Sequence, residues 1–200
     1  MSKKEELGRL KSEMEKTSLP LKKGATNLVF GEGNPDAKIF FLGEGPGYNE
    51  DVKGRPFVGQ AGALLNQLLQ SIKVERNSVF ITNVVCYRPP GNRDPLPEEI
   101  GAFQPYIDKM MEIIKPKIVV TLGRFSMAKF LPGVKISIVH GSAFVVNWKG
   151  REIKVVPMYH PAAALRNGDV MFQIKEDFLK LPGLIREINS KIDAKQMELI

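Results

Sequence analysis

The stretch GEGPGYNEDVKGRPFVGQAG, residues 43–62, decides the fold that this chain is expected to adopt. It is rich in glycine and proline, follows the apolar run 37–42 and precedes an apolar helical pattern over 60–72. A glycine-rich turn between a strand and a helix places backbone N–H groups and a helix N-terminus at one edge of a sheet, where anions and polar ligands bind. The spacing fits neither the dinucleotide-binding fingerprint nor the P-loop, since no Gly-Lys-Ser/Thr follows.

Helical and strand patterns alternate along the rest of the chain. Helices are predicted over 3–16, 60–72, 97–114 and 123–131, and strands over 37–42, 79–85, 117–122 and 155–158. Residues 135–139 and 143–148 alternate like a hairpin around Gly141, and the C-terminal third is helical with a break at Pro182 and Gly183. This alternation predicts an α/β fold, a doubly wound and mainly parallel sheet between helices in three α/β/α layers. No linker or repeat divides residues 1–200, so a single domain is expected.

Composition narrows the class of protein. Lys and Arg number 29 against 22 Asp and Glu, and the net charge of +7 mildly supports a polyanionic partner, but many basic proteins bind no nucleic acid, so charge alone does not decide this. No apolar stretch is long enough to span a membrane, and the N-terminus, charged from Lys3 onward, does not resemble a signal peptide. The single cysteine, Cys86, excludes an intramolecular disulfide and an all-cysteine metal cage within one chain. These features predict an intracellular protein.

Polar segments follow three of the predicted strands, beginning at Gly43, Asn83 and His160. In a doubly wound sheet the binding site lies beyond the carboxyl ends of the strands, so these segments are expected to converge. Glu44 and Phe57 then join Asn83 and His160 in one pocket. An aromatic face, an amide and an imidazole suit a planar heterocycle, because the ring can stack while the amide offers a donor and an acceptor to a base edge.

Each of these residues also has a plain structural explanation. A phenylalanine is more often part of the core, and an asparagine at a strand end often caps a turn. Glu44 and Glu50 could be solvated loop acids or partners of a helix dipole. The order of Phe57, Asn83 and His160 along three strand ends favours the functional interpretation. His140 has no such context, and it is interpreted as a turn histidine.

Three motifs resemble the uracil-DNA glycosylase superfamily, and within it the thermostable family-four type. They are the glycine-rich stretch 43–62, ITNVV at 81–85 with RPPGNRDP at 88–95, and HPAA at 160–163. The resemblance extends from about Val29 to Asn167. It implies a monofunctional glycosylase of base excision repair, which flips uracil out of DNA, hydrolyses the N-glycosidic bond without a cofactor and leaves an abasic site.

The resemblance also implies roles for individual residues. Phe57 resembles the residue on which the flipped base stacks, Asn83 the amide that reads the uracil edge, and His160 the donor to the uracil oxygen that gains charge. Glu50 takes the place of the residue that excludes a thymine methyl group, and Gly45 belongs to the loop that contacts the base. The implied DNA contacts are Arg55, Arg88, Arg93, Ala163, Leu165 and Arg166.

The chemistry of the reaction is consistent with these roles. Cleavage leaves an oxocarbenium-like sugar and an anionic base, so the rate depends on donors placed where the anion forms. Asn83, His160 and backbone N–H groups of the glycine-rich loop can supply them. Other branches of the superfamily carry an aspartate at the position of Gly45, so no strong base is evident for the attacking water. Glu44 is the nearest candidate to orient that water, and a structural role is its alternative.

The cysteine count departs from the family-four pattern. Members of that branch carry four cysteines that hold an iron–sulfur cluster, and those positions fall here on Lys16, Leu19, Tyr87 and Phe103, with Cys86 one residue from the third. No four-thiolate cage can form, so no metal is predicted. A packed cluster of Leu19, Tyr87 and Phe103 is expected to hold the N-terminal helix instead. The alternatives are a register shifted by one residue, or a helix that docks elsewhere.

Other functions remain open at this point. A non-catalytic uracil- or DNA-binding protein is disfavoured by the intact set of Phe57, Asn83 and His160. A glycosylase for other deaminated bases, such as hypoxanthine or xanthine, is weakly disfavoured by Glu50 together with Asn83. An unrelated nucleotide-binding enzyme is disfavoured by the missing P-loop lysine. The expected partner is uracil-containing DNA, single- or double-stranded, and the chain is expected to be a monomer with no membrane contact.

Overall fold

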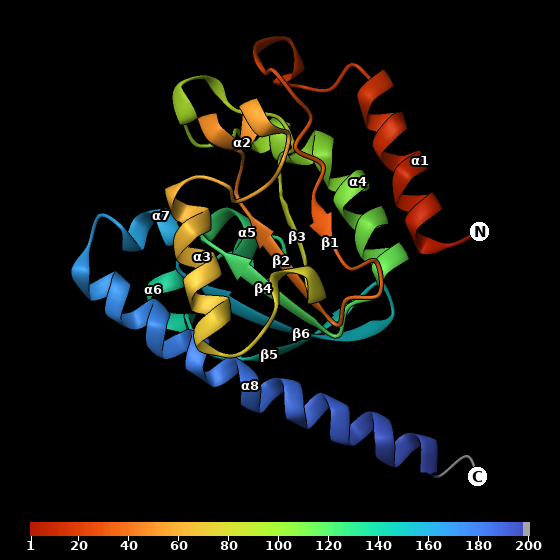
Figure 1. Ribbon diagram of the computed structural model, residues 1–200, viewed down its shortest axis with the longest axis vertical. Helices are drawn as coiled ribbons and strands as arrows, with labels where there is room; N and C mark the ends of the chain where they lie inside the picture. The colour runs from red at the N-terminus through yellow and green to blue at the C-terminus, as the bar shows by residue number, and fades with distance from the viewer. Residues whose placement is uncertain (198–200) are drawn as a thin grey trace.

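A six-stranded sheet forms the centre of the computed structural model, which describes residues 1–197 (Figure 1). Its strands are β1 (Glu32–Gly33), β2 (Ile39–Gly43), β3 (Phe80–Asn83), β4 (Ile118–Leu122), β5 (Phe144–Trp148) and β6 (Arg151–Met158), in the spatial order β1-β3-β2-β4-β6-β5. The four inner strands run parallel, while β1 and β5 pair antiparallel at the two edges. The predicted doubly wound, mainly parallel sheet is therefore confirmed.

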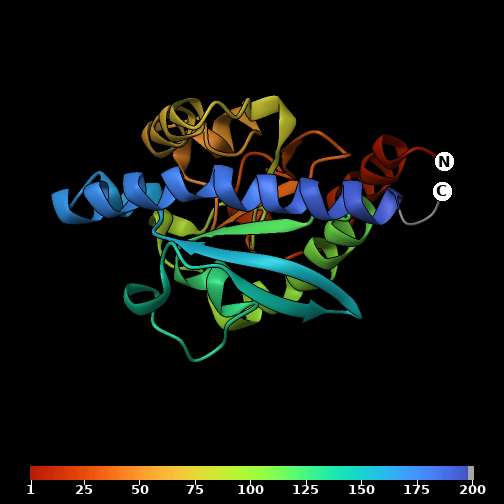
Figure 2. The ribbon, with the colours of Figure 1, turned by 90° about the horizontal axis from the view of Figure 1, so that it is seen from below.

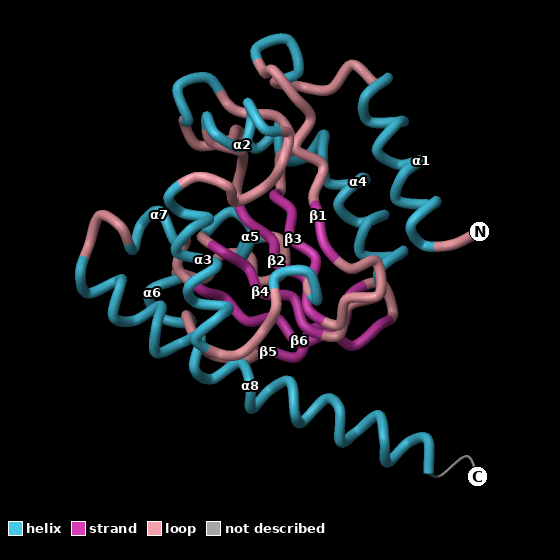
Figure 3. Tube along the Cα trace, viewed as in Figure 1, coloured by secondary structure: helices cyan, strands magenta, loops and turns pink. Residues whose placement is uncertain are grey.

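Helices enclose the sheet (Figure 3). They are α1 (Lys3–Lys16), α2 (Tyr48–Lys53), α3 (Gln60–Ser71), α4 (Pro97–Ile114), α5 (Arg124–Ala128), α6 (Ile136–Val139), α7 (Pro161–Ala164) and α8 (Gly168–Met197). Local sequence explains where the long ones begin. Ser2 caps α1, because its Oγ accepts the Glu5 N–H at 3.3 Å while the Glu5 carboxylate accepts the Ser2 N–H at 2.8 Å. Pro97 opens α4, where the missing N–H costs no hydrogen bond.

Alternate side chains of the buried strands face opposite layers. Phe40 and Leu42 pack into a cluster that includes residues of α1 and α4. Ile39 and Phe41 pack into a second cluster, which includes residues of α3 and α8. Because both faces are covered, the central strands β2 and β4 are nearly continuous apolar runs in the sequence. Figure 2 shows the resulting arrangement, with the sheet running between helical layers.

The predicted hairpin is misplaced. Residues 135–139 do not form a strand, since Ile136–Val139 is helix α6. The hairpin instead joins β5 to β6, and it turns at Lys149 and Gly150, whose φ angles are 48° and 77°. A single helical turn is too short to show helical periodicity, so its apolar residues were indistinguishable from strand alternation.

The predicted break at Pro182 and Gly183 is also wrong, because α8 continues through both residues. A proline inside a helix removes one backbone hydrogen bond and crowds the preceding turn. That turn is held by Phe178 and Leu181, which are both fully buried against the sheet. Tertiary packing therefore outweighs the local preference for a break.

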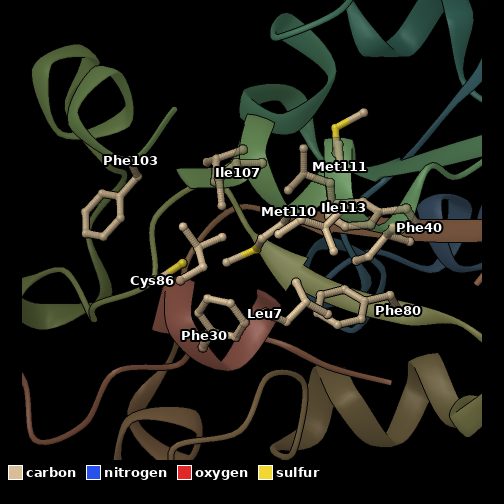
Figure 4. Packing of buried hydrophobic residues seen from close by; sticks show 14 of the residues in the cluster. Leu7, Phe30, Phe40, Phe80, Cys86, Phe103, Ile107, Met110, Met111 and Ile113 are labelled. Atoms are coloured by element: carbon tan, nitrogen blue, oxygen red, sulfur yellow. The ribbon is translucent and has the colours of Figure 1, made fainter. Parts of the chain in front are cut away.

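Apolar packing joins the N-terminal segment to α4. It occurs at three positions where the family-four pattern has cysteines and this chain has other residues. Leu19, Tyr87 and Phe103 are 9%, 4% and 0% exposed and belong to one core cluster. The Tyr87 and Phe103 ring centroids lie 6.1 Å apart. Cys86 is fully buried in this cluster (Figure 4), and burial raises the pKa of its thiol to about 12. These residues, with the exposed Lys16, do not fit an iron–sulfur cluster, which requires thiolates.

Truncation of this cluster is expected to lower the free energy of unfolding. Phe103→Ala should cost about 3–5 kcal/mol, because it leaves a cavity in a fully buried site. The effects of Tyr87→Ala and Phe103→Ala should be non-additive in a double-mutant cycle, since the rings are in contact. Chemical denaturation measures both quantities. Phe172→Ala is the control, because that ring is 67% exposed. A small Phe103 effect, similar to that of the control, would show that this cluster contributes little to the free energy of unfolding.

Candidate active site

The carboxyl ends of β2, β3 and β6 meet at one edge of the sheet. The strands β3 and β4 lie on opposite sides of β2, so the crevice outside β2 is a topological switch point. Backbone hydrogen bonds hold the segments after β2 and β3 together, from Val84 N–H to Gly43 O at 3.0 Å and from Val85 N–H to Glu44 O at 3.2 Å. A cavity of about 330 Å³ opens between these segments and α7.

This cavity collects most of the predicted site residues. The predicted residues in its lining are Glu44, Gly45, Glu50, Phe57, Asn83, Arg93, His160, Ala163 and Arg166. Arg55, Arg88 and Leu165 lie outside the lining. The Arg88 guanidinium lies over the ring of Tyr48, the first residue of α2, at 5.2 Å from the ring centroid, and this contact joins α2 to the segment after β3. Asn92 and Asp94 also line the cavity. The sequence analysis identified the motif 88–95 that contains them, but it predicted no role for these two side chains.

Asn83 ends β3 with its side chain buried and its Oδ1 without a hydrogen-bond partner among the described residues. A buried acceptor without a donor costs free energy, so this amide is suited to receive a donor from a ligand. Gly43 is the residue opposite in the sheet register. A Cβ there would lie 2.3 Å from Asn83 Oδ1 and 2.7 Å from the Phe57 ring. Only glycine allows these two side chains to approach each other.

Phe57 has a φ of 51°, in the left-handed region that aromatic residues rarely adopt. Two hydrogen bonds fix the backbone that follows it, since the Val58 and Gly59 N–H groups donate to Glu50 Oε1 at 2.8 and 2.7 Å. Gly62 allows α3 to approach the Phe57 backbone, because a Cβ there would lie 1.9 Å from the Phe57 carbonyl oxygen. The Glu50 carboxylate therefore shapes this loop as well as lining the cavity.

His160 caps α7, and its Nδ1 accepts the Ala162 N–H at 3.1 Å. Burial lowers the pKa of His160 to about 4; the Glu50 carboxylate opposes this shift and the Arg166 guanidinium adds to it. The imidazole is therefore neutral at neutral pH, and because Nδ1 is an acceptor, the proton is on Nε2. The ring stacks near Phe57, with centroids 5.6 Å apart.

Glu44 follows β2, and burial raises its pKa while the N–H of Phe125 opposes the shift. That N–H donates to Glu44 Oε1 at 3.2 Å. Gly123, at the end of β4, has a φ of 104°, and a Cβ there would lie 2.3 Å from the same oxygen. The first turn of α5 thus holds this carboxylate at the cavity wall. The glycine between strand and helix was the available signal for this contact.

His140 lies in a turn after α6, as expected, but it is not isolated. Its Nδ1 lies 2.6 Å from Oδ2 of the buried Asp177, and its ring centroid lies 4.7 Å from that of Tyr159. Lys180 also donates to Asp177 at 2.9 Å. This pair connects α8 to the residue before His160 and lies outside the cavity.

Within residues 1–197, no three His, Cys, Asp or Glu side chains gather where a metal ion could be held. No helix in the same part has the length and apolar character needed to cross a membrane.

Comparison with known proteins identifies relatives that span most of the chain. The model of the uracil DNA glycosylase superfamily matches residues 30–181. A type-4 uracil-DNA glycosylase of Sulfurisphaera tokodaii is 51% identical over 165 residues, which cover 80% of this chain and 75% of the relative. The type-4 enzyme of Thermotoga maritima is 43% identical over 188 residues, covering 92% and 97%. That of Archaeoglobus fulgidus is 45% identical over 170 residues, covering 82% and 85%.

The protonation state of His160 can be tested directly. In isotope-labelled protein, NMR of the ring nitrogens should show a neutral imidazole with its proton on Nε2 at neutral pH, which becomes protonated only near pH 4. The chain has two histidines, so His160→Gln assigns the signals. Because the unfolded chain takes up this proton near pH 6.5, stability should fall as the pH falls from 6.5 toward 4. Titration of His160 near 6.5 in the folded protein would contradict the assignment.

Proposed function

The chain belongs to the uracil-DNA glycosylase superfamily, and we propose that it removes uracil from DNA by hydrolysing the N-glycosidic bond, leaving an abasic site for base excision repair. The observation that carries this proposal is the buried Oδ1 of Asn83, which has no hydrogen-bond partner among the described residues and lies beside a neutral imidazole and an aromatic ring in a cavity of about 330 Å³. A cavity of this kind suits one flipped base, held by stacking and by hydrogen bonds to its edge. We expect the protein to act as a monomer, inside the cell, on single- or double-stranded DNA.

Phe57 and Asn83 recognise the flipped base in this proposal. Phe57 presents its ring to the face of the base, and Asn83 presents its amide to the edge. An amide suits uracil because it can accept from N3–H and donate to O4. Glu50 excludes the thymine methyl group. Its carboxylate is held by the Val58 and Gly59 N–H groups, so a larger base cannot easily displace it.

His160 stabilises the leaving group. As the bond breaks, negative charge develops on the uracil oxygens, and a fixed donor there lowers the barrier. The neutral His160 offers its Nε2–H, while the Ala162 N–H fixes the orientation of the ring through Nδ1. A neutral donor avoids the cost of burying a full positive charge in the free enzyme. Backbone N–H groups near Gly45 are further donors in the same loop.

Glu44 is proposed to orient the attacking water. Its carboxyl group lies in the cavity wall, and burial raises its pKa toward the range in which a carboxylate can accept a proton. The Phe125 N–H opposes that shift and fixes the position of Oε1. Gly45, where other branches carry an aspartate, supplies no second carboxylate.

The DNA contacts are proposed on the rim of the cavity. Arg55 pairs with Glu32 and Arg93 pairs with Glu99, so both charges are already partly compensated. Arg88 donates to Asn92 at 2.7 Å. Arg166 lines the cavity and follows the exposed Leu165, next to Ala163. Of the four arginines, Arg166 is therefore the best candidate for a direct phosphate contact.

Asn83→Asp tests the proposed reading of the base. A carboxylate repels the anionic leaving group and cannot donate to O4, so excision of uracil from an oligonucleotide should fall about 10²–10³-fold, the effect of one lost oxyanion donor. The measurement is single-turnover cleavage followed by alkaline strand breakage. Excision at the wild-type rate would exclude the assigned role. Absence of excision by the wild-type protein would refute the proposed function itself.

Arg166→Ala tests the proposed DNA surface. Loss of one phosphate contact should reduce the slope of log K against log salt by about 0.9 on duplex DNA. The matched control is Arg151→Ala, because Arg151 begins β6 at the opposite edge of the sheet and donates to Pro116 O. An equal change of slope in both variants would show a general charge effect and no specific contact at Arg166.

A further inference from the structure

A hydrogen-bonded network lies behind Phe57, outside the cavity. Arg76, in the turn before β3, donates through Nε and Nη2 to Glu32 Oε1 at 3.1 and 2.9 Å. Its Nη1 donates to Asn66 Oδ1 at 2.9 Å, and its Nη2 also donates to the Pro56 carbonyl at 2.7 Å. Neither Arg76, Glu32 nor Asn66 lines the cavity. One guanidinium therefore connects β1, α3 and the peptide group directly before Phe57.

The Glu32 carboxylate anchors this network from the edge of the sheet. It accepts from Arg55 Nε at 2.6 Å and from Arg55 Nη2 at 3.2 Å, in addition to the two bonds from Arg76. Burial works to raise the pKa of Glu32, but the bonds and charges of Arg55 and Arg76 hold the pKa below its ordinary value. Charge-assisted and bidentate bonds of this kind are short and directional, so they fix geometry as well as charge.

The backbone of Phe57 is thereby fixed on both sides. Arg76 holds the carbonyl of Pro56, and Glu50 holds the N–H groups of Val58 and Gly59. A left-handed backbone at a residue other than glycine costs about 1–3 kcal/mol and persists where the surroundings over-determine it. With a φ of 51°, Phe57 meets that condition. Without the Arg76 contact, the Pro56 carbonyl would lose this donor, although Arg55 would still tie the preceding residue to Glu32.

We propose that Arg76, oriented by Glu32, is a positioning residue that holds the Phe57 ring where the flipped base stacks on it. The stacking role of Phe57 rests on the proposed function, while the network itself does not. Arg76 acts only through the Pro56 carbonyl, and it contacts neither the base nor the reacting bond. Lysine is a poor substitute, because a single ammonium cannot reproduce the planar fork that reaches Glu32, Asn66 and the carbonyl together.

A double-mutant cycle on uracil excision tests this coupling. Arg76→Ala should lower kcat/KM about 10–100-fold, the scale expected when a substrate-contacting group is misplaced. The Arg76→Ala, Phe57→Ala double variant should be no slower than Phe57→Ala alone, since both changes remove the same platform. In contrast, the effects of Arg76→Ala and His160→Ala should multiply. The kcat/KM of Arg76→Lys should lie between that of the wild type and that of Arg76→Ala.

Two controls separate the positioning role from loss of a neighbouring hydrogen bond and from unfolding. Asn66→Ala removes one bond of Arg76 but leaves those to Glu32 and Pro56, so its excision rate should stay close to that of the wild type. Thermal denaturation of every variant sets an assay temperature at which each remains folded. A loss of stability in Arg76→Ala with no change of excision rate at that temperature would overturn the proposal.

Amide hydrogen exchange in the protein without DNA gives an independent readout. Exchange at Val58 and Gly59 should speed up in Arg76→Ala and stay unchanged in Asn66→Ala. If the wild type excises no uracil, the proposed function fails, and the exchange result alone decides whether Arg76 holds the Phe57 segment. If the wild type excises uracil and the Arg76 and Phe57 effects multiply, the positioning role is overturned whatever the exchange shows.

Discussion

The site depends on the absence of a side chain at Gly43, because Asn83 and Phe57 occupy the space that a Cβ would fill. β2 and β3 place Gly43 and Asn83 side by side, and the Phe57 ring returns to the same point from the far end of the glycine-rich loop. A single added methyl group would overlap both side chains, at 2.3 Å from the amide and 2.7 Å from the ring. A parallel sheet supplies the amide at a strand end, and the missing side chain allows the ring to approach it. In the proposed function, a flat base would meet both side chains without movement of the core.

The surrounding structure keeps this close approach in place. The Phe57 segment is attached to Glu50 on one side and to Arg76 on the other, and α3 is able to pack on it at Gly62. These contacts come from α2, α3 and the turn before β3. The wall of the cavity that carries Phe57 is therefore held from several sides, while the exposed side chains of Tyr48 and Leu165 lie nearer to solvent. Rigid walls suit discrimination by shape, because a misfitting base meets fixed atoms and cannot rearrange them.

The sequence was sufficient for the convergence of Phe57, Asn83 and His160, because strand ends in a parallel sheet meet at one edge and the motifs mark those ends. It was also sufficient for α1, α3 and α4, whose apolar periodicity is local. The sequence did not predict the pairing of Arg76 with Glu32 or of His140 with Asp177, since each pair joins residues far apart in the chain. The misplaced hairpin and the unbroken α8 have a related cause. A one-turn helix has no readable period, and buried packing of Phe178 overrides a proline.

The position of β6 in the chain has a consequence for biosynthesis. A ribosome releases Phe57 and Asn83 long before His160, which follows β6, the last strand of the sheet in chain order. The apolar face formed by Ile39, Phe41 and α3 also waits for Phe178 of α8 to cover it. Nascent chains are thus exposed to aggregation on that face until the final third emerges. The same delay means that the imidazole joins the cavity only when the sheet is complete, so an unfinished polypeptide carries the residues proposed to recognise the base without the residue proposed to donate to it.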